Sequence, residues 1–126
     1  MRFPNGVKPL SDLAKSYGMK FLLWFAPEEI WPRTDLAKKH PEWVMKPGPP
    51  GPIDLTNHEA REYMTRYMNT VIKEWGIDWW RTDGGPSLAH WETNDKDTDR
   101  KGMTEMRYVE GYYRMWDDMR AKKIQP

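Results

Sequence analysis

The chain has 126 residues, with 20 Lys and Arg against 19 Asp and Glu, a formal net charge of +1 and no cysteine. Its length suits one domain, its balanced charge argues against a nucleic-acid binder or a basic membrane-surface module, and no apolar run is long enough for a membrane span. The lack of cysteine excludes disulfides and thiolate metal sites, while eight tryptophans indicate either an aromatic core or a site that stacks flat ligands such as sugar rings.

The N-terminal part predicts a helix followed by a strand. Pro9 suits a first helical turn, so a helix is expected over residues 8–17, and Gly18 ends it. Residues 19–25 are almost entirely apolar and are closed by Pro27, which is typical of a strand buried on both faces. The expected helix carries one apolar face, made of Leu10, Leu13, Ala14 and Tyr17.

A long connection follows this strand. Residues 34–40 predict a short helix that Pro41 ends, and residues 42–45 a brief extended piece. Residues 46–52, with the sequence KPGPPGP, predict an exposed loop without regular structure. Residues 53–55 are a candidate for a short strand.

Residues 57–75 give the clearest helical signal of the chain. Thr56 and Glu59 match the capping box at its start, and Gly76 ends it. The stripe expected to face the core is continuous and consists of Ala60, Tyr63, Met64, Tyr67, Met68, Val71, Ile72 and Trp75.

The C-terminal part predicts a second buried strand over residues 77–82, which residues 83–86 (DGGP) break sharply. Residues 87–101 are polar and are expected to form a loop, and a last helix is expected over residues 103–122. The inward side chains expected on this helix are Met106, Val109, Tyr112, Tyr113, Trp116 and Met119.

This alternation of helices and strands predicts an α/β fold with a parallel sheet. Two good strands do not close such a sheet, and a complete (β/α)₈ barrel takes about 250 residues. We therefore expect residues 1–126 to form part of a larger domain.

Functional side chains of parallel α/β folds gather at the C-terminal ends of strands. Arg81 and Asp83 share one face of the second strand at that end. A nearby guanidinium favours an ionised carboxylate, which is what a glycosidase nucleophile requires. The alternative is an ordinary Arg–Asp pair that ends a strand, and spacing alone makes this the more common case.

Trp24 occupies the corresponding end of the first strand, on the face that also holds Leu22 and Ala26, together with Glu28 if the strand extends that far. A tryptophan there is either a platform for a sugar ring or one more buried aromatic side chain.

The remaining sequence patterns give no support for a metal, phosphate or triad site. His40, His58 and His90 match no metal motif in their spacing, so we expect no metal. The alternating aspartates of residues 95–99 lack the glycine and glutamate of a calcium loop and predict a solvated loop. No phosphate-binding glycine loop and no Ser/His/Asp motif is recognisable, and no cofactor is expected.

Several short segments, taken in their order along the chain, match the pattern of a known protein family. They read RFPNGVKPL, GMKFLLWFAPE, HPEWV, IDLTN and GIDWWRTD, followed by Trp91, Asn94-Asp95, DRKGMTE and RYVEG. Together they cover essentially the whole chain and resemble glycoside hydrolase family 36, the α-galactosidases.

The resemblance implies a fragment of a (β/α)₈ barrel that hydrolyses terminal α-linked galactose with retention. Asp83 matches the catalytic nucleophile, Arg81 a basic residue that contacts substrate hydroxyls, and Trp24 a tryptophan that lines the galactose pocket. The implied partners are an α-galactoside or oligosaccharide substrate and either the remainder of the barrel or further copies of the chain.

The chain departs from the family pattern around the nucleophile. The family often has Lys-Trp-Asp-Met-Asn or, in the more similar branch, Arg-Gln-Asp-Phe-Asn, where this chain has Arg-Thr-Asp-Gly-Gly. Ala26 stands where a Glu is common. The resemblance also implies an acid/base carboxyl group beyond Pro126 and an Asp-Asp-Gly-Trp segment before Met1.

Two other functions stay open. The chain could be a non-catalytic remnant that binds carbohydrate or serves as a scaffold. Gly84 and Gly85 could also admit a larger 2-substituent, as in an α-N-acetylgalactosaminidase. Whichever function applies, we expect the isolated chain to be inactive and poorly folded, because two strands leave sheet edges and apolar helix faces uncovered.

Overall fold

The computed structural model describes residues 3–26, 28–48, 50–95, 99 and 102–121. Its centre is a pair of parallel strands, β1 (Leu22–Phe25) and β4 (Trp79–Thr82), which helix α3 (His58–Trp75) connects. This is the expected α/β arrangement, and within the described ranges the pair is not extended into a wider sheet. Pro27, Asp97 and Lys122, which entered the sequence-based expectations, lie outside the described residues.

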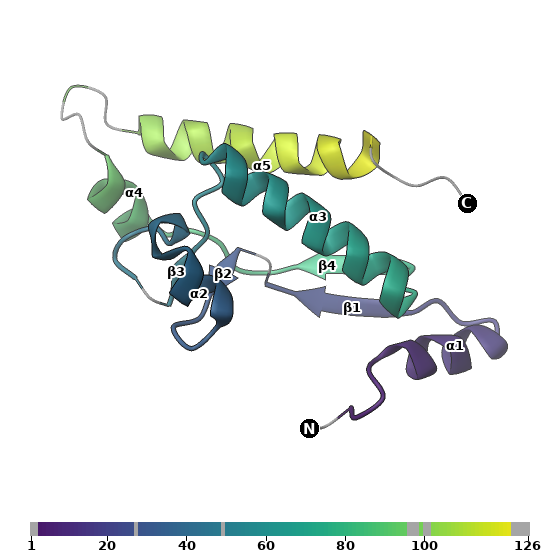
Figure 1. The fold of residues 1–126 in the computed structure, drawn as a ribbon. Coiled ribbons are helices and arrows are strands. Elements are labelled where there is room, and N and C mark those ends of the chain that lie inside the picture. The colour runs from purple at the N-terminus through teal and green to yellow at the C-terminus, as the bar shows by residue number, and fades with distance from the viewer. Residues whose placement is uncertain (1–2, 27, 49, 96–98, 100–101, 122–126) are drawn as a thin grey trace.

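Two helices cover one face of the strand pair. Figure 1 shows α3 and α5 (Met103–Ala121) side by side over β1 and β4. Phe25 stacks on Trp75 of α3, with ring centroids 6.0 Å apart. Trp80 meets Trp116 of α5 edge to face at 5.1 Å. Alternate side chains of both strands are therefore anchored under these helices.

The opposite face of the strand pair is open. Leu22, Trp24 and Trp79 are 49%, 57% and 68% exposed. The expectation that both strands are buried on both faces is therefore wrong for this chain, because no described element covers the second face. Side chains along each strand alternate between covered and open positions.

Helix α3 matches its expected extent closely. It ends at Gly76, which has the left-handed backbone conformation of a C-terminal cap (φ 65°). Its N-cap is Asn57, whose Oδ1 accepts from the amides of Glu59 and Ala60 at 2.9 and 3.2 Å. The capping box expected at Thr56 is therefore wrong, because the Thr56 hydroxyl donates instead to Asp54 at 2.6 Å. The described buried side chains of this helix are Ala60, Met64, Thr65, Met68 and Val71.

Helix α1 (Lys8–Ser16) lies beyond the N-terminal ends of the two strands, at the lower right of Figure 1. We call this end of the strand pair its lower end. It forms over nearly the expected residues, but its apolar face is not buried: Leu13 and Tyr17 are 55% and 73% exposed. The buried residue is Ser11, on the side that faces Gly76.

The connection after β1 contains a small antiparallel pair, β2 (Glu29–Ile30) with β3 (Gly51–Pro52). The expectation of an exposed loop throughout 46–52 is wrong at its end, because Gly51 and Pro52 are buried. Residues 53–55 form no strand, although Ile53 makes an isolated antiparallel bridge to Val44.

Between these strands the expected helix over 34–40 is confirmed as α2 (Asp35–Lys39), which Thr34 caps. The extended piece expected over 42–45 is wrong in its first half. Pro41–Trp43 form a short 3₁₀ helix, η1, which buries the Trp43 ring in the core.

The loop expected over 87–101 is also wrong, because it contains helix α4 (Leu88–Asn94). The Ser87 amide donates to Nδ1 of His90 at 3.0 Å, which starts the helix. Trp91 packs against the core from this helix and meets the Tyr108 ring of α5 edge to face. The polar composition of the segment concealed this anchor.

The expected inward face of α5 is partly wrong. Met106, Val109 and Tyr113 are exposed, whereas the buried side of the helix holds Tyr108, Gly111, Met115 and Met119. Gly111 explains this rotation, since a Cβ atom there would lie 2.1 Å from the Leu55 carbonyl oxygen. The helix therefore makes its closest approach through a residue without a side chain.

The core lies between α3, α5 and the β2–β3 region. The buried cluster consists of Ile30, Trp43, Met45, Ile53, Leu55, Ala60, Met64, Met68, Tyr108, Met115 and Met119.

No described helix is long and apolar enough to cross a membrane.

Candidate functional site

The residues expected to carry chemistry lie near the C-terminal ends of β1 and β4, which we call the upper end of the strand pair. Trp24 and Arg81 are cross-strand partners in the parallel register. The Arg81 guanidinium carbon lies 5.2 Å from the centroid of the Trp24 ring, within the range of a cation–π contact. Both side chains stand on the open face, where a ligand has access. Trp24 is 57% exposed within the described residues, and its role as a sugar platform stays a prediction.

Asp83 follows β4 directly and is exposed. Its amide donates to the Phe25 carbonyl oxygen at 3.2 Å, which continues the pairing of the strands by one more hydrogen bond. Its carboxylate Oδ1 accepts from the Gly84 amide at 3.0 Å. Within the described residues no ion pair joins Arg81 to Asp83, because the guanidinium turns toward Trp24 instead.

A buried carboxyl group lies beside this site, and sequence analysis did not single it out. Glu28 is 7% exposed, and its Oε2 accepts a hydrogen bond from the hydroxyl of Tyr108, which is 4% exposed. Burial raises the pKa of Glu28, the Tyr108 hydrogen bond opposes that rise, and the neighbouring Glu29 charge adds to it. Burial also raises the pKa of Tyr108, so its hydroxyl keeps its proton and donates it.

The two glycines after Asp83 pack against carboxyl groups. Gly84 has φ 102°, and a Cβ there would lie 3.3 Å from Oε1 of Glu29. Gly85 has φ 130°, and a Cβ there would lie 3.3 Å from Oε2 of Glu28. Both the left-handed backbone and the close carboxyl oxygens favour glycine at these positions.

The other sequence patterns have local structural roles. Asp95 accepts from the amides of Gly102 and Thr104 at 3.0 and 3.1 Å, so it organises the start of α5. His40 stacks on Trp43 with ring centroids 3.7 Å apart. In the part of the chain that the structure describes, no group of three or more His, Asp or Glu side chains is arranged to hold a metal ion.

A cavity of about 660 Å³ opens between the 41–56 segment and the α4–α5 region. Its charged lining side chains are those of Glu42, Lys46, Asp54, Asp95 and Arg107. None of the three predicted site residues lines it, so it is separate from the open strand face.

Some of the eight tryptophans belong to the core, and others are exposed as a ligand-stacking surface would require. Trp43 is buried, and Trp80, Trp91 and Trp116 pack at the edge of the core. Trp24, Trp31 and Trp79 are more than half exposed. Both an aromatic core and an accessible aromatic surface are therefore present.

Comparison with known proteins gives a consistent set of relatives. The Melibiase family model matches residues 1–125. The chain is 33% identical over 120 residues to α-galactosidase Mel36A of Lactobacillus acidophilus, covering 89% of this chain and 16% of that protein. It is similar in fold to the α-galactosidase of Lactobacillus brevis, with a TM-score of 0.79, 25% identity, and 96% of this chain and 17% of that one covered.

A variant of the Geobacillus stearothermophilus family 36 α-galactosidase AgaA, in complex with stachyose, is similar in fold at a TM-score of 0.77 and 23% identity. That match covers 95% of this chain and 18% of the other. The chain therefore spans less than a fifth of the length of these relatives.

Proposed function

Because the chain belongs to the Melibiase family, we propose that it is the part of a retaining α-galactosidase that carries the catalytic nucleophile, Asp83. The observation that supports this most is the shared position of Asp83, Arg81 and Trp24. All three are exposed where β1 and β4 end, and that is the edge at which parallel α/β enzymes act.

The open strand face supports a barrel for the complete protein. In a (β/α)₈ barrel the helices cover the outer face of the strands, and the inner face is filled by side chains from neighbouring strands. Here α3 and α5 cover one face. Leu22, Trp24, Trp79 and Arg81 stand on the other. We propose that this second face is the barrel interior, completed by strands from outside residues 1–126.

The chemistry assigned to the site has two steps. An Asp83 carboxylate oxygen attacks the anomeric carbon while the glycosidic C–O bond breaks, and the leaving oxygen takes a proton from a second carboxyl group. Water, deprotonated by that second group, then hydrolyses the glycosyl ester and regenerates Asp83. We propose that the second group comes from outside these 126 residues. Arg81 and Trp24 orient the sugar through its hydroxyls and its apolar ring face.

The proposed substrates are oligosaccharides with terminal α-linked galactose. The AgaA structure in complex with stachyose supports this class, as does the exposed aromatic face at Trp24. Gly84 and Gly85 give no specific support for a 2-acetamido sugar, because their packing against Glu29 and Glu28 already accounts for the absence of side chains.

The test uses the complete gene product that contains this segment, with p-nitrophenyl α-galactoside as substrate. Asp83→Asn is expected to lower kcat at least a thousandfold, since loss of a nucleophile in a covalent mechanism removes most of the rate enhancement. Asp35→Asn, an exposed aspartate on α2, is the matched control and should leave kcat unchanged. Full turnover by Asp83→Asn would contradict the assignment.

The same protein tests the non-catalytic alternative. Calorimetric titration with galactose would show binding in either case, but a carbohydrate-binding remnant would bind without turnover. A complete gene product that binds galactose and hydrolyses neither the p-nitrophenyl substrate nor raffinose would favour the remnant.

A further inference from the structure

A buried hydrogen-bonded pair, Glu28 with Tyr108, lies directly behind the segment that carries Asp83. Glu28 comes just after β1, and its carbonyl oxygen accepts from the Ile53 amide at 2.7 Å. This contact fixes the backbone of Glu28 against the core. Its side chain is therefore held at a defined place rather than extended into solvent.

The side chain of Glu28 connects α5 to the loop after β4. One side of the carboxyl group receives the Tyr108 hydroxyl, and the ring of Tyr108 is itself held edge to face by Trp91 at 5.1 Å. The same oxygen, Oε2, is the nearest atom to the position of a Cβ on Gly85. Glu28 thus spans the distance between helix α5 and the residue two positions after Asp83.

Helix α5 holds the other side of Asp83 as well. One turn after Tyr108, the hydroxyl of Tyr112 lies 3.3 Å from Oγ1 of Thr82. Tyr108 and Tyr112 share one face of α5 because they are four residues apart. The helix therefore contacts Thr82 directly and, through Glu28, lies close to the place that a side chain on Gly85 would occupy, and Asp83 lies between these two residues in the chain.

We propose that Glu28 and Tyr108 are positioning residues that fix the Asp83 segment for nucleophilic attack, which rests on the proposed function of Asp83. Attack requires the carboxylate oxygen to be aligned with the anomeric carbon, and small displacements of a reacting group cost large factors in rate. The pair limits movement of the chain at Gly85, where the glycine backbone alone is permissive.

Glu28 does not suit the role of the second carboxyl group. It is buried, and its oxygen is engaged by α5 on the covered side of the strands. Trp24 and Arg81, in contrast, stand on the open face where substrate would enter. This separates two effects that an experiment can measure: a proton donor acts on the leaving group, whereas a positioning residue acts on the nucleophile.

The test compares Glu28→Gln, Tyr108→Phe and the double variant in the complete gene product, each on p-nitrophenyl α-galactoside and on raffinose. We expect kcat to fall about tenfold in each single variant, with KM within about twofold, and by the same factor on both substrates. The double variant should lose no more than the larger single loss, because the two side chains act as one unit.

Matched controls are Glu62→Gln and Tyr67→Phe on α3, whose side chains are partly exposed and distant in sequence from the site. They should leave kcat unchanged. If Glu28→Gln fails to fold, Tyr108→Phe alone decides, since it removes only one hydroxyl group.

Three results would overturn the proposal. Unchanged kcat in both single variants would show a purely structural pair. A larger loss on raffinose than on the activated substrate would make Glu28 a proton donor. Additive losses in the double variant would show two independent effects. A wild-type protein without any hydrolysis would instead contradict the proposed function, so the two failures are distinguishable.

Discussion

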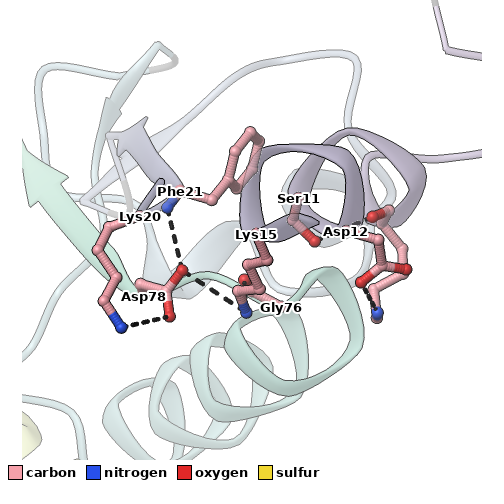
Figure 2. Close-up of polar contacts among 8 residues, drawn as sticks. Ser11, Asp12, Lys15, Lys20, Phe21, Gly76 and Asp78 are labelled. Atoms are coloured by element: carbon pink, nitrogen blue, oxygen red, sulfur yellow. Dashed lines mark hydrogen bonds and ion pairs between the residues drawn. The ribbon is translucent and has the colours of Figure 1, made fainter. Parts of the chain in front are cut away.

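Asp78 and Glu28 are carboxylates at opposite ends of the same strand pair. At the lower end Asp78 accepts from the Phe21 amide at 3.0 Å. The ammonium groups of Lys15 and Lys20 lie 3.6 and 3.9 Å from its oxygens (Figure 2). The Phe21 amide, followed by the charges of the two lysines, lowers the pKa of Asp78, while its partial burial opposes this. The ionised form of Asp78 therefore stabilises the start of both strands.

At the upper end the pKa of the carboxyl group is shifted in the opposite direction. Burial raises the pKa of Glu28, and its described hydrogen-bond donor is the neutral hydroxyl of Tyr108. The two ends of the strand pair therefore hold their carboxyl groups for different purposes. Charges near Asp78 are arranged so that the folded state is favoured, whereas Glu28 is retained at an energetic cost where geometry matters for the site.

Gly85 at the upper end and Gly76 at the lower end both have positive φ. Replacing each of them by alanine is expected to have the largest effects among the tests of this comparison. In Gly85→Ala the new methyl group meets Glu28 Oε2 at 3.3 Å on a backbone with φ 130°. We expect the loop that carries Asp83 to shift and kcat to fall about tenfold or more. Steady-state kinetics on p-nitrophenyl α-galactoside measure this. Unchanged kcat would mean that the upper end tolerates movement.

Gly76→Ala is the matched change at the lower end. Its Cβ would lie 2.8 Å from Ser11 Oγ, on a left-handed backbone with φ 65°. We expect the complete protein to lose about 2 kcal/mol of unfolding free energy, from the left-handed conformation and the contact with α1. Denaturant titration measures this loss, while kcat at 25 °C should stay unchanged. A fall in kcat as large as that of Gly85→Ala would erase the distinction between the ends.

The lower end and α3 are the parts of the fold that sequence patterns describe best. Helix α3 could be predicted almost to the residue, because its apolar stripe is continuous and Gly76 ends it. The cap was misassigned by one position because Thr56 and Asn57 are both good caps. The Thr56 hydroxyl is instead engaged in a local hydrogen bond with Asp54, two residues before it.

The side of α5 that faces the core could not be predicted, because aromatic and methionine residues occur on several sides of that helix. Its buried side is decided by Gly111, which lets the helix approach the Leu55 carbonyl. No periodicity of apolar residues contains that information. Similarly, α4 and the β2–β3 pair are too short to produce a repeating pattern.

The site residues could be predicted only in part. Trp24 and Arg81 could be placed at one edge because the ends of parallel strands meet there, and the structure brings these two side chains together. Asp83 follows β4 directly, and its role as nucleophile stays a prediction. The pair of Glu28 and Tyr108 could not be found, since its members are 80 residues apart and meet only through the packing of α5. A carboxyl group just after a strand was the one available signal.

The opposite pKa shifts predict opposite pH dependences. Asp78 contributes stability that is present above about pH 4, the usual range of aspartate, and is lost as the pH falls below it. Glu28 carries a cost that is absent at low pH and grows as the pH rises from about 4.3 through its raised pKa. Denaturant midpoints of Asp78→Asn and Glu28→Gln against pH measure both.

For Asp78→Asn we expect a deficit in stability that shrinks as the pH falls. For Glu28→Gln we expect the stability relative to wild type to improve as the pH rises. Glu59→Gln, an exposed carboxylate in the first turn of α3, is the control. Parallel curves for the two variants would show that both ends hold their carboxylates in the same way.

The smallest expected effect separates the two lysines at Asp78. Lys15 also donates to the Gly76 carbonyl at 2.8 Å, as Figure 2 shows. The side chain of Lys20 is 84% exposed and only reaches Asp78 at 3.9 Å. We expect Lys15→Met to lower the local opening free energy at the Phe21 amide by about 1 kcal/mol, and Lys20→Met by less than about 0.3 kcal/mol. Hydrogen exchange of the peptide that contains Phe21 measures this opening.

Salt sharpens the distinction between these lysines. At about 1 M NaCl the screening length falls to about 3 Å, so the small effect of Lys20→Met should vanish, whereas most of the Lys15→Met effect should remain because it comes from a hydrogen bond. Lys73→Met in the last turn of α3 is the control for removal of a positive charge. If both lysines contribute equally and both effects vanish in salt, diffuse charge would hold the lower end together. The lower end would then lack the fixed geometry that Glu28 and Tyr108 give the upper end.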